Sequence, residues 1–181
     1  MSNKSSRDSL PAWDLKDFYQ DIHDPEIQAD LNEYKSGMEK FAADYKGRVG
    51  SLTAEKFYQA VRKIEDLSVK ASRLGEFAYL NMVTQMKNAE AMGFYQNISE
   101  KLTDYSKPAI FFSLEINALP DAKIAEWLRN DKVVFYKPWL EKTRRFKDYE
   151  LSEEVEEILH EKSVTSSSAW VRLYEETSSR L

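Results

Sequence analysis

The chain has 181 residues, 42% of them hydrophobic and 13% aromatic, which supplies a packed core and excludes a disordered protein. The formal net charge of -5 gives no sign of a nucleic-acid or anionic-membrane partner. The absence of cysteine excludes disulfides, a thiol nucleophile and thiolate metal ligands. The sequence shows neither a secretory signal nor the run of about 20 apolar residues that spans a membrane. We therefore expect a cytoplasmic protein.

The polar residues 1–12 predict a flexible N-terminal tail. An aromatic anchor that follows is expected to dock on the body of the protein; its members are Trp13, Leu15, Phe18, Tyr19 and Ile22. Asp24 and Pro25 then form a favourable helix start, because Asp can cap a helix and Pro is tolerated at its first position. Apolar residues spaced by four and three from Ile27 to Tyr45 predict a helix that ends at Gly47.

Two further long helices are expected from the same helical spacing. Thr53 can cap a helix whose apolar stripe continues to about Val83, and Asn88 can cap the next one. Pro108 is expected to kink this third helix, because proline removes a backbone donor and clashes with the preceding turn. Residues 13–118 thus predict a bundle of long antiparallel helices.

Residues 119–181 predict a second set of shorter helices, and no strand pattern competes, so the fold class is all-α. Ser152 is expected to cap one of these helices. The apolar side chains expected to face inward from it are Val155, Ile158 and Leu159. A Ser-rich turn then leads to a helix with an apolar face that nothing later in the chain covers. We expect this face to be exposed; it carries Trp170, Leu173 and Tyr174.

His160 and Glu161 are the pair that most resembles a metal motif. A zinc peptidase uses H-E-x-x-H on a helix, where both histidines reach the metal and the glutamate activates water. Here the last position of that motif is Val164, and the other histidine, His23, lies far away in the sequence. The pair is therefore interpreted as a surface His-Glu pair.

Three other patterns also have ordinary structural explanations. Glu157 and His160 match the E-x-x-H of di-iron bundles, but Gln20 stands where a second motif needs Glu. The basic run 142–147 fits a helix C-terminus, where cations complement the helix dipole. Residues 166–168 are three serines without His or acid partners nearby in sequence, so helix capping is expected. We therefore expect no catalytic, cofactor-binding or metal-binding residue in this chain.

Four stretches, in order and spacing, resemble the oligoendopeptidase F branch of the M3 peptidases. They are Leu10–Leu15 with Phe18-Tyr19 and Asp24-Pro25; Phe111–Ile116 with Leu119–Asp121; Trp139–Glu141 through Arg144–Phe146; and Leu151–Glu156 with Glu161–Val164 and Ser168–Tyr174. The likeness covers nearly all of the chain after the polar tail. Pro108 departs from it, since the resemblance implies an uninterrupted helix there.

The resemblance implies a zinc-dependent oligoendopeptidase that hydrolyses short peptides in a deep cleft. In that family the catalytic domain, with H-E-x-x-H and a further Glu ligand, lies C-terminal to this region. The resemblance therefore implies that residues 119–181 form an oligopeptidase F-type domain and that the zinc site lies beyond residue 181. It further implies that this segment walls the cleft and binds no zinc itself. The partners would be an oligopeptide substrate and the catalytic domain. The alternative is a stand-alone helical interaction module without catalytic activity.

Overall fold

The computed structural model describes residues 13–178. They are mostly helical and contain no strand, so the predicted all-α fold is confirmed. The α-helices are α1 (Pro25–Tyr45), α2 (Ala54–Thr84), α3 (Ala89–Ser106), α4 (Phe111–Ala118), α5 (Asp121–Trp127), α6 (Asp131–Val134), α7 (Lys137–Arg144), α8 (Glu153–Thr165) and α9 (Ser167–Ser178). Short 3-10 turns are η1 (Val49–Ser51), η2 (Lys107–Ala109) and η3 (Lys147–Tyr149).

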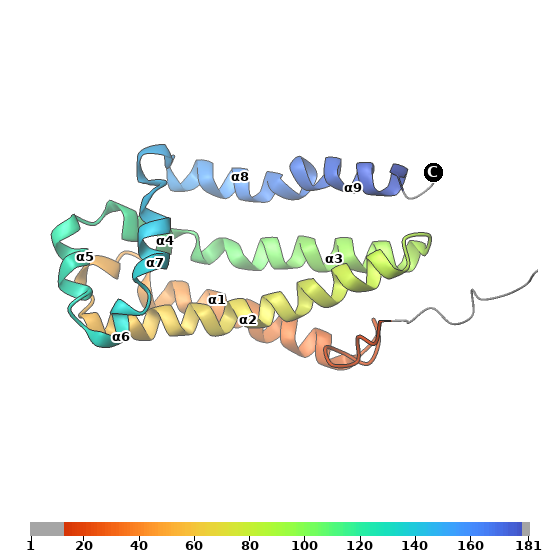
Figure 1. The fold of residues 1–181 in the computed structure, drawn as a ribbon, viewed down its shortest axis with the longest axis horizontal. Coiled ribbons are helices and arrows are strands. Elements are labelled where there is room, and N and C mark those ends of the chain that lie inside the picture. The colour runs from red at the N-terminus through yellow and green to blue at the C-terminus, as the bar shows by residue number, and fades with distance from the viewer. Residues whose placement is uncertain (1–12, 179–181) are drawn as a thin grey trace, which may run out of the picture.

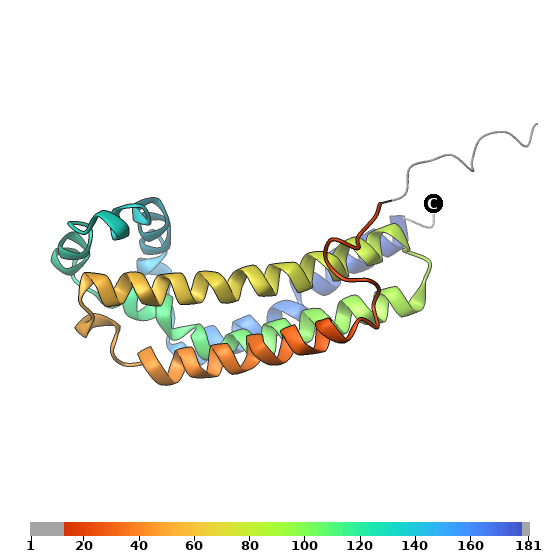
Figure 2. The same ribbon diagram turned by 90° about the horizontal axis from the view of Figure 1, so that it is seen from below.

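Helices α1, α2 and α3 run antiparallel and side by side, as the spacing of their apolar residues predicts (Figure 1). The short helices α4–α7 gather at one end of this bundle. Helices α8 and α9 then follow one another along the outer side of α3 (Figures 1 and 2). The molecule is therefore elongated, with most of its backbone parallel to one axis.

Side-chain caps fix the starts of the long helices, where the predicted caps Asp24, Thr53 and Asn88 are confirmed. The predicted side-chain cap at Ser152 is wrong, because its side chain makes no capping hydrogen bond at the start of α8. Asp24 Oδ1 accepts a hydrogen bond from the backbone N–H of Glu26 at 2.9 Å. The Thr53 and Asn88 side chains accept equivalent bonds at the starts of α2 and α3. Each cap satisfies a backbone donor that has no partner within its helix. The sequence therefore encodes these helix starts locally.

Pro108 interrupts the chain between α3 and α4, as predicted. The residues around it form the 3-10 turn η2, and α4 starts again at Phe111. Proline cannot donate an N–H to the helix ladder, so the α-helix ends before it and a new one begins after it. This break places Phe111 and Phe112 in the core, where both pack against Phe41.

The larger of two hydrophobic cores joins the long helices to the short ones. Trp127 of α5 is fully buried and stacks on Phe57 of α2, with ring centroids 3.9 Å apart. Its indole N–H donates to the carbonyl of Leu52 at 3.0 Å, so the buried polar group is satisfied. Residues on both sides of the expected boundary at 118 thus share one core. The division of the chain at that boundary stays a prediction.

The smaller core lies at the opposite end of the bundle and includes part of the aromatic anchor. Tyr19 is buried and packs edge-on against Phe77. Its hydroxyl donates to the buried carboxylate of Asp30 at 2.7 Å. Trp13, however, is 72% exposed, so the expectation that it docks is wrong. The described structure places no apolar surface against it.

The expected orientation of α8 is also wrong. Its apolar side chains Val155, Ile158 and Leu159 are exposed instead of facing inward. The reason is that α8 packs on α3 through its polar face, where His160 lies within hydrogen-bond distance of Ser106. A helical stripe of apolar residues predicts the helix, but it does not say which side meets the bundle.

Candidate functional site

His160 fastens α8 to the end of α3. Its Nε2 lies 2.7 Å from the Ser106 hydroxyl and 3.1 Å from the backbone carbonyl of Thr103. The next residue, Glu161, forms an ion pair with Lys107 at 2.8 Å. The hydrogen bonds that Lys107 donates to the carboxylates of Asp104 and Glu161 raise the pKa of its ammonium group. Both side chains of the His-Glu pair therefore contact the end of α3 or the residue after it, and these contacts hold α8 against the bundle.

His23 lies at the other end of α3 and is exposed. Its Nε2 is 3.5 Å from the carboxylate of Glu90, in the first turn of α3, whereas His160 contacts Ser106 in the last turn. Sixteen residues of helix separate these contacts, a rise of about 24 Å. The two histidines therefore cannot share one metal ion.

The donor set of residues 13–178 does not fit a catalytic zinc ion. That part of the chain holds no group of three or more His, Asp or Glu side chains arranged to bind a metal. Glu157 lies one turn before His160, yet no second such pair approaches them. A catalytic zinc site needs about three protein ligands and an open position for water. No step of metal chemistry is therefore assigned to these residues.

The basic run 142–147 has a structural role that its charge alone did not predict. Arg144 closes the last turn of α7 and donates to the carbonyls of Ile116 at 2.7 Å and Leu119 at 3.0 Å. Its guanidinium also binds the Asp121 carboxylate at 2.6 Å. One side chain thus binds two carbonyls at the end of α4 and joins them to the start of α5; the Ile116 carbonyl also accepts the backbone N–H of Leu119.

Two further polar contacts lock α4 in place. The Glu115 carboxylate accepts hydrogen bonds from the backbone N–H groups of Gly47 and Val49, at 2.6 and 3.1 Å. Gly47 has φ +73°, the left-handed conformation that ends α1. On the other side, the buried Asn117 amide donates to the carboxylate of Glu150. Sequence reasoning missed these contacts and the role of Arg144, since they join residues 23 to 68 positions apart.

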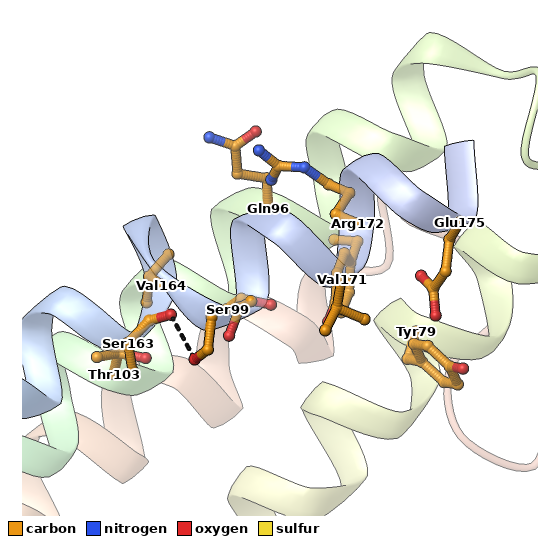
Figure 3. A pocket seen from close by; sticks show the side chains of 12 residues that line it. Tyr79, Gln96, Ser99, Thr103, Ser163, Val164, Val171, Arg172 and Glu175 are labelled. Carbon is orange, nitrogen blue, oxygen red and sulfur yellow. Dashed lines mark hydrogen bonds between the residues drawn. The ribbon is translucent and has the colours of Figure 1, made fainter. Parts of the chain in front are cut away.

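A cavity of about 290 Å³ with mixed polar and apolar walls lies between α9 and the bundle (Figure 3). Its walls carry hydroxyl, amide and charged side chains. They come from α2 and α3 on one side and from α8 and α9 on the other, and include Tyr79, Gln96, Ser99, Ser163, Arg172 and Glu175. The serines at 166–168 follow α8, and Ser166 donates to the carbonyl of Lys162 at 2.6 Å, a local contact at a helix end.

A more apolar pocket of about 560 Å³ lies between α2, α4 and the start of α7. Phe112, Tyr136 and Trp139 contribute aromatic walls. The hydroxyl of Tyr136 donates to Glu65 at 2.8 Å, and burial raises the pKa of this tyrosine. Apart from this pair and two serines the lining is apolar, which is typical of an apolar binding surface.

Neither pocket contains a group with the geometry of a hydrolytic centre, and no helix in residues 13–178 is long and apolar enough to cross a bilayer. Comparison with known families returns a match between residues 115–181 and the model for the N-terminal region of the M3 peptidases, described as oligopeptidase F. No curated protein and no solved structure matches the chain. The matched segment starts at Glu115 and includes Arg144, His160 and the whole of α5–α9. The match covers somewhat more than a third of the chain, and over residues 115–181 it agrees with the resemblance to oligoendopeptidase F seen in the sequence.

Proposed function

We propose that this chain is the N-terminal helical part of a cytoplasmic, zinc-dependent oligoendopeptidase that hydrolyses short peptides. The family match over residues 115–181 carries this proposal. In this proposal, the zinc ligands and the catalytic glutamate belong to a catalytic domain C-terminal to residue 181. Zinc there would activate water and polarise the peptide carbonyl. The residues of this chain would hold no metal and would enclose the substrate.

The shape of the long bundle supports a role in enclosure. Helix α2 has 31 residues and so spans about 46 Å, longer than an extended peptide of ten residues. A cleft wall must keep its shape when no substrate is bound. The Glu115 and Arg144 contacts supply this rigidity, because each joins segments that are distant in the sequence. Such a wall admits short flexible peptides and excludes folded proteins.

The test compares peptide cleavage by residues 1–181 with cleavage by a longer chain that includes the catalytic domain. Both are assayed on a quenched short peptide, with and without a chelator, and bound metal is measured. We expect metal content and chelator-sensitive cleavage in the longer chain alone. Chelator-sensitive cleavage by residues 1–181 would contradict the assignment of zinc to the catalytic domain. A longer chain that is inactive, or active without metal, would contradict the enzymatic proposal.

One observation favours a second candidate, a helical interaction module without catalytic activity. The outer face of α9 is apolar and exposed, with Trp170 at 70% of its maximum exposure. Exposed apolar patches of this kind mark protein interaction sites. The same metal and cleavage measurements separate the two candidates, since a pure interaction module gives no active longer chain.

A further inference from the structure

Helices α8 and α9 are amphipathic with the apolar side turned to solvent. Towards the bundle they present mainly polar groups, among them His160, Ser163 and Arg172, together with two valines, Val164 and Val171. Away from the bundle, these helices and Leu151 just before α8 present large apolar side chains, each at least 39% exposed. They are Leu151, Val155, Ile158, Leu159, Trp170, Leu173 and Tyr174. We call these seven side chains the outer stripe. No residue of α8 is buried.

The outer stripe is long and continuous enough to be an interface. The two helices follow one another from residue 153 to 178 (Figure 1), a length of about 39 Å at 1.5 Å per residue. With 150–250 Å² for a large aromatic side chain and somewhat less for the aliphatic ones, the exposed fractions amount to roughly 800 Å². That is about one side of a standard-size protein interface.

Carboxylates border the α8 half of this stripe. Glu154 and Glu156 lie on either side of Val155, each about 100° around the helix from it. Neither forms an ion pair within residues 13–178, whereas Glu153 binds Lys46 and Glu161 binds Lys107. Glu156 accepts one hydrogen bond, from the backbone N–H of Leu151. The edges of the stripe therefore carry negative charge that a partner would have to complement.

A second copy of this chain supplies little of the complementary charge. The exposed Lys162 of α8 lies seven residues after Val155, within the stripe and not at the edges where Glu154 and Glu156 stand. In an antiparallel pair, α8 of one copy would meet α9 of the other. Within the described part of α9 the basic residue is Arg172, and its side chain lines the cavity towards α3 (Figure 3). In a parallel pair, Glu154 and Glu156 would face their own equivalents, and like charges repel. The observed charges thus favour a different molecule.

We propose that the outer stripe is the docking surface for an amphipathic helix whose apolar seam is flanked by lysine or arginine at the α8 end. This inference rests on the proposed function, because the catalytic domain would supply that helix. Apolar seams packed between helices give the affinity, and the charged edges fix the orientation of the partner.

The test measures binding of residues 1–181 to two synthetic amphipathic helices by fluorescence anisotropy. Both peptides carry the same leucine seam. One has lysines along the edges of one half, and the other has glutamates at the same positions. We expect the lysine peptide to bind at least tenfold more tightly, a difference of about 1.4 kcal/mol. Equal affinities, or tighter binding of the glutamate peptide, would overturn the proposal.

Variants locate the binding on the outer stripe. Trp170→Ser with Leu173→Ser should weaken both peptides at least tenfold, whereas Glu154→Gln with Glu156→Gln should remove only the preference for lysine. Val69→Ser is the matched control, because Val69 is an exposed apolar residue on α2, outside the stripe. Binding that survives the Trp170 and Leu173 changes, or that falls equally with Val69→Ser, would refute the location.

Sedimentation of residues 1–181 without peptide tests whether a second copy of the chain covers the outer stripe. We expect a monomer. A dimer that Trp170→Ser with Leu173→Ser dissociates would assign the stripe to a second copy and overturn the proposal. Failure of the docking proposal can be told apart from failure of the proposed function. An inactive longer chain would leave peptide binding by residues 1–181 unchanged, and an active longer chain does not require that this peptide binds.

Discussion

The guanidinium of Arg144 binds the carboxylate of Asp121 at 2.6 Å and at the same time donates hydrogen bonds to the carbonyls of Ile116 and Leu119. Asp121 is the first residue of α5, and Ile116 lies in the last turn of α4. Arg144 therefore holds the corner at which the chain leaves the long bundle for the short helices. The Arg144 side chain itself is largely shielded from water.

Replacement of Arg144 by Ala should destabilise the protein by about 2 kcal/mol, since hydrogen bonds made by a charged group contribute more than neutral ones. Most of this loss comes from the two charged hydrogen bonds, because Asp121 is almost fully solvated and its ion pair is screened. The Leu119 carbonyl loses its Arg144 donor, whereas the Ile116 carbonyl still accepts the backbone N–H of Leu119. The free energy of unfolding in urea measures it. Arg145→Ala is the matched control, as Arg145 is exposed. An equal loss in both variants would contradict the role of Arg144.

Replacement of Trp127 by Ala should cost about 3–5 kcal/mol, because it leaves a cavity beside Phe57 and an unsatisfied carbonyl at Leu52. The urea midpoint and the amide protection of α5 report the change. Trp170→Ala removes an equally large side chain from the surface and should leave the midpoint nearly unchanged. If the two variants were equally destabilised, the shared core would not join α5 to α2 as described.

Local signals predicted much of the fold. Asp24, Thr53 and Asn88 cap the helices because a side-chain oxygen two or three residues before a free N–H suffices for the bond. Pro108 breaks the helix for an equally local reason. Wherever the structural cause lies within one turn of helix, the sequence pattern is enough to identify it.

The sequence did not predict which side of α8 faces the bundle, because contacts between distant residues decide it. The stripe of Val155, Ile158 and Leu159 marks an amphipathic helix equally well whether it faces the bundle or a partner. What decides its direction is the contact of His160 with Ser106, 54 positions away in the sequence. Arg144 was interpreted through the helix dipole for the same reason, since the carbonyls that it satisfies come close only after folding.

The buried carboxylate of Asp30 should make stability depend on acid pH. Asp30 is 6% exposed and lies 2.7 Å from Lys70 and 3.2 Å from Arg73. Burial raises the pKa of this carboxyl, but hydrogen bonds from Lys70 and Tyr19 outweigh it and hold the pKa below its usual value. A depressed folded-state pKa stabilises the fold above the unfolded-state pKa, near 3.9 for Asp, and that contribution is lost as the pH falls through the folded value.

Asp30→Asn should therefore lower the free energy of unfolding by roughly 3 kcal/mol at neutral pH, because it leaves Lys70 and Arg73 without their buried partner. The difference from the unchanged protein should shrink as the pH falls from about 4, the unfolded-state pKa, through the lower folded-state pKa of Asp30. Urea unfolding at a series of pH values measures both. Asp44→Asn is the control, since Asp44 pairs with Lys63 at a more exposed site. A difference that does not vary with pH would contradict the charge assigned to Asp30.

His160 should control the docking of α8 without controlling global stability. It is the side chain that joins α8 to both Ser106 and the Thr103 carbonyl at the end of α3. Because α8 contributes no buried residue to the core, His160→Ala should change the free energy of unfolding by only about 1 kcal/mol. Amide exchange in α8 and α9 should nevertheless become faster, since local opening no longer breaks these bonds.

Hydrogen exchange of the two histidine variants distinguishes a docking role from a general loss of stability. His23→Ala is the matched control: His23 is exposed and pairs with Glu90 at 3.5 Å, at the far end of α3. Its replacement should leave exchange in α8 and α9 unchanged. Protection that is the same in the His160 variant and the unchanged protein would show that Glu153 with Lys46 and Glu161 with Lys107 hold the two helices on their own. Faster exchange throughout α1–α3 would instead place His160 in the stability of the whole bundle.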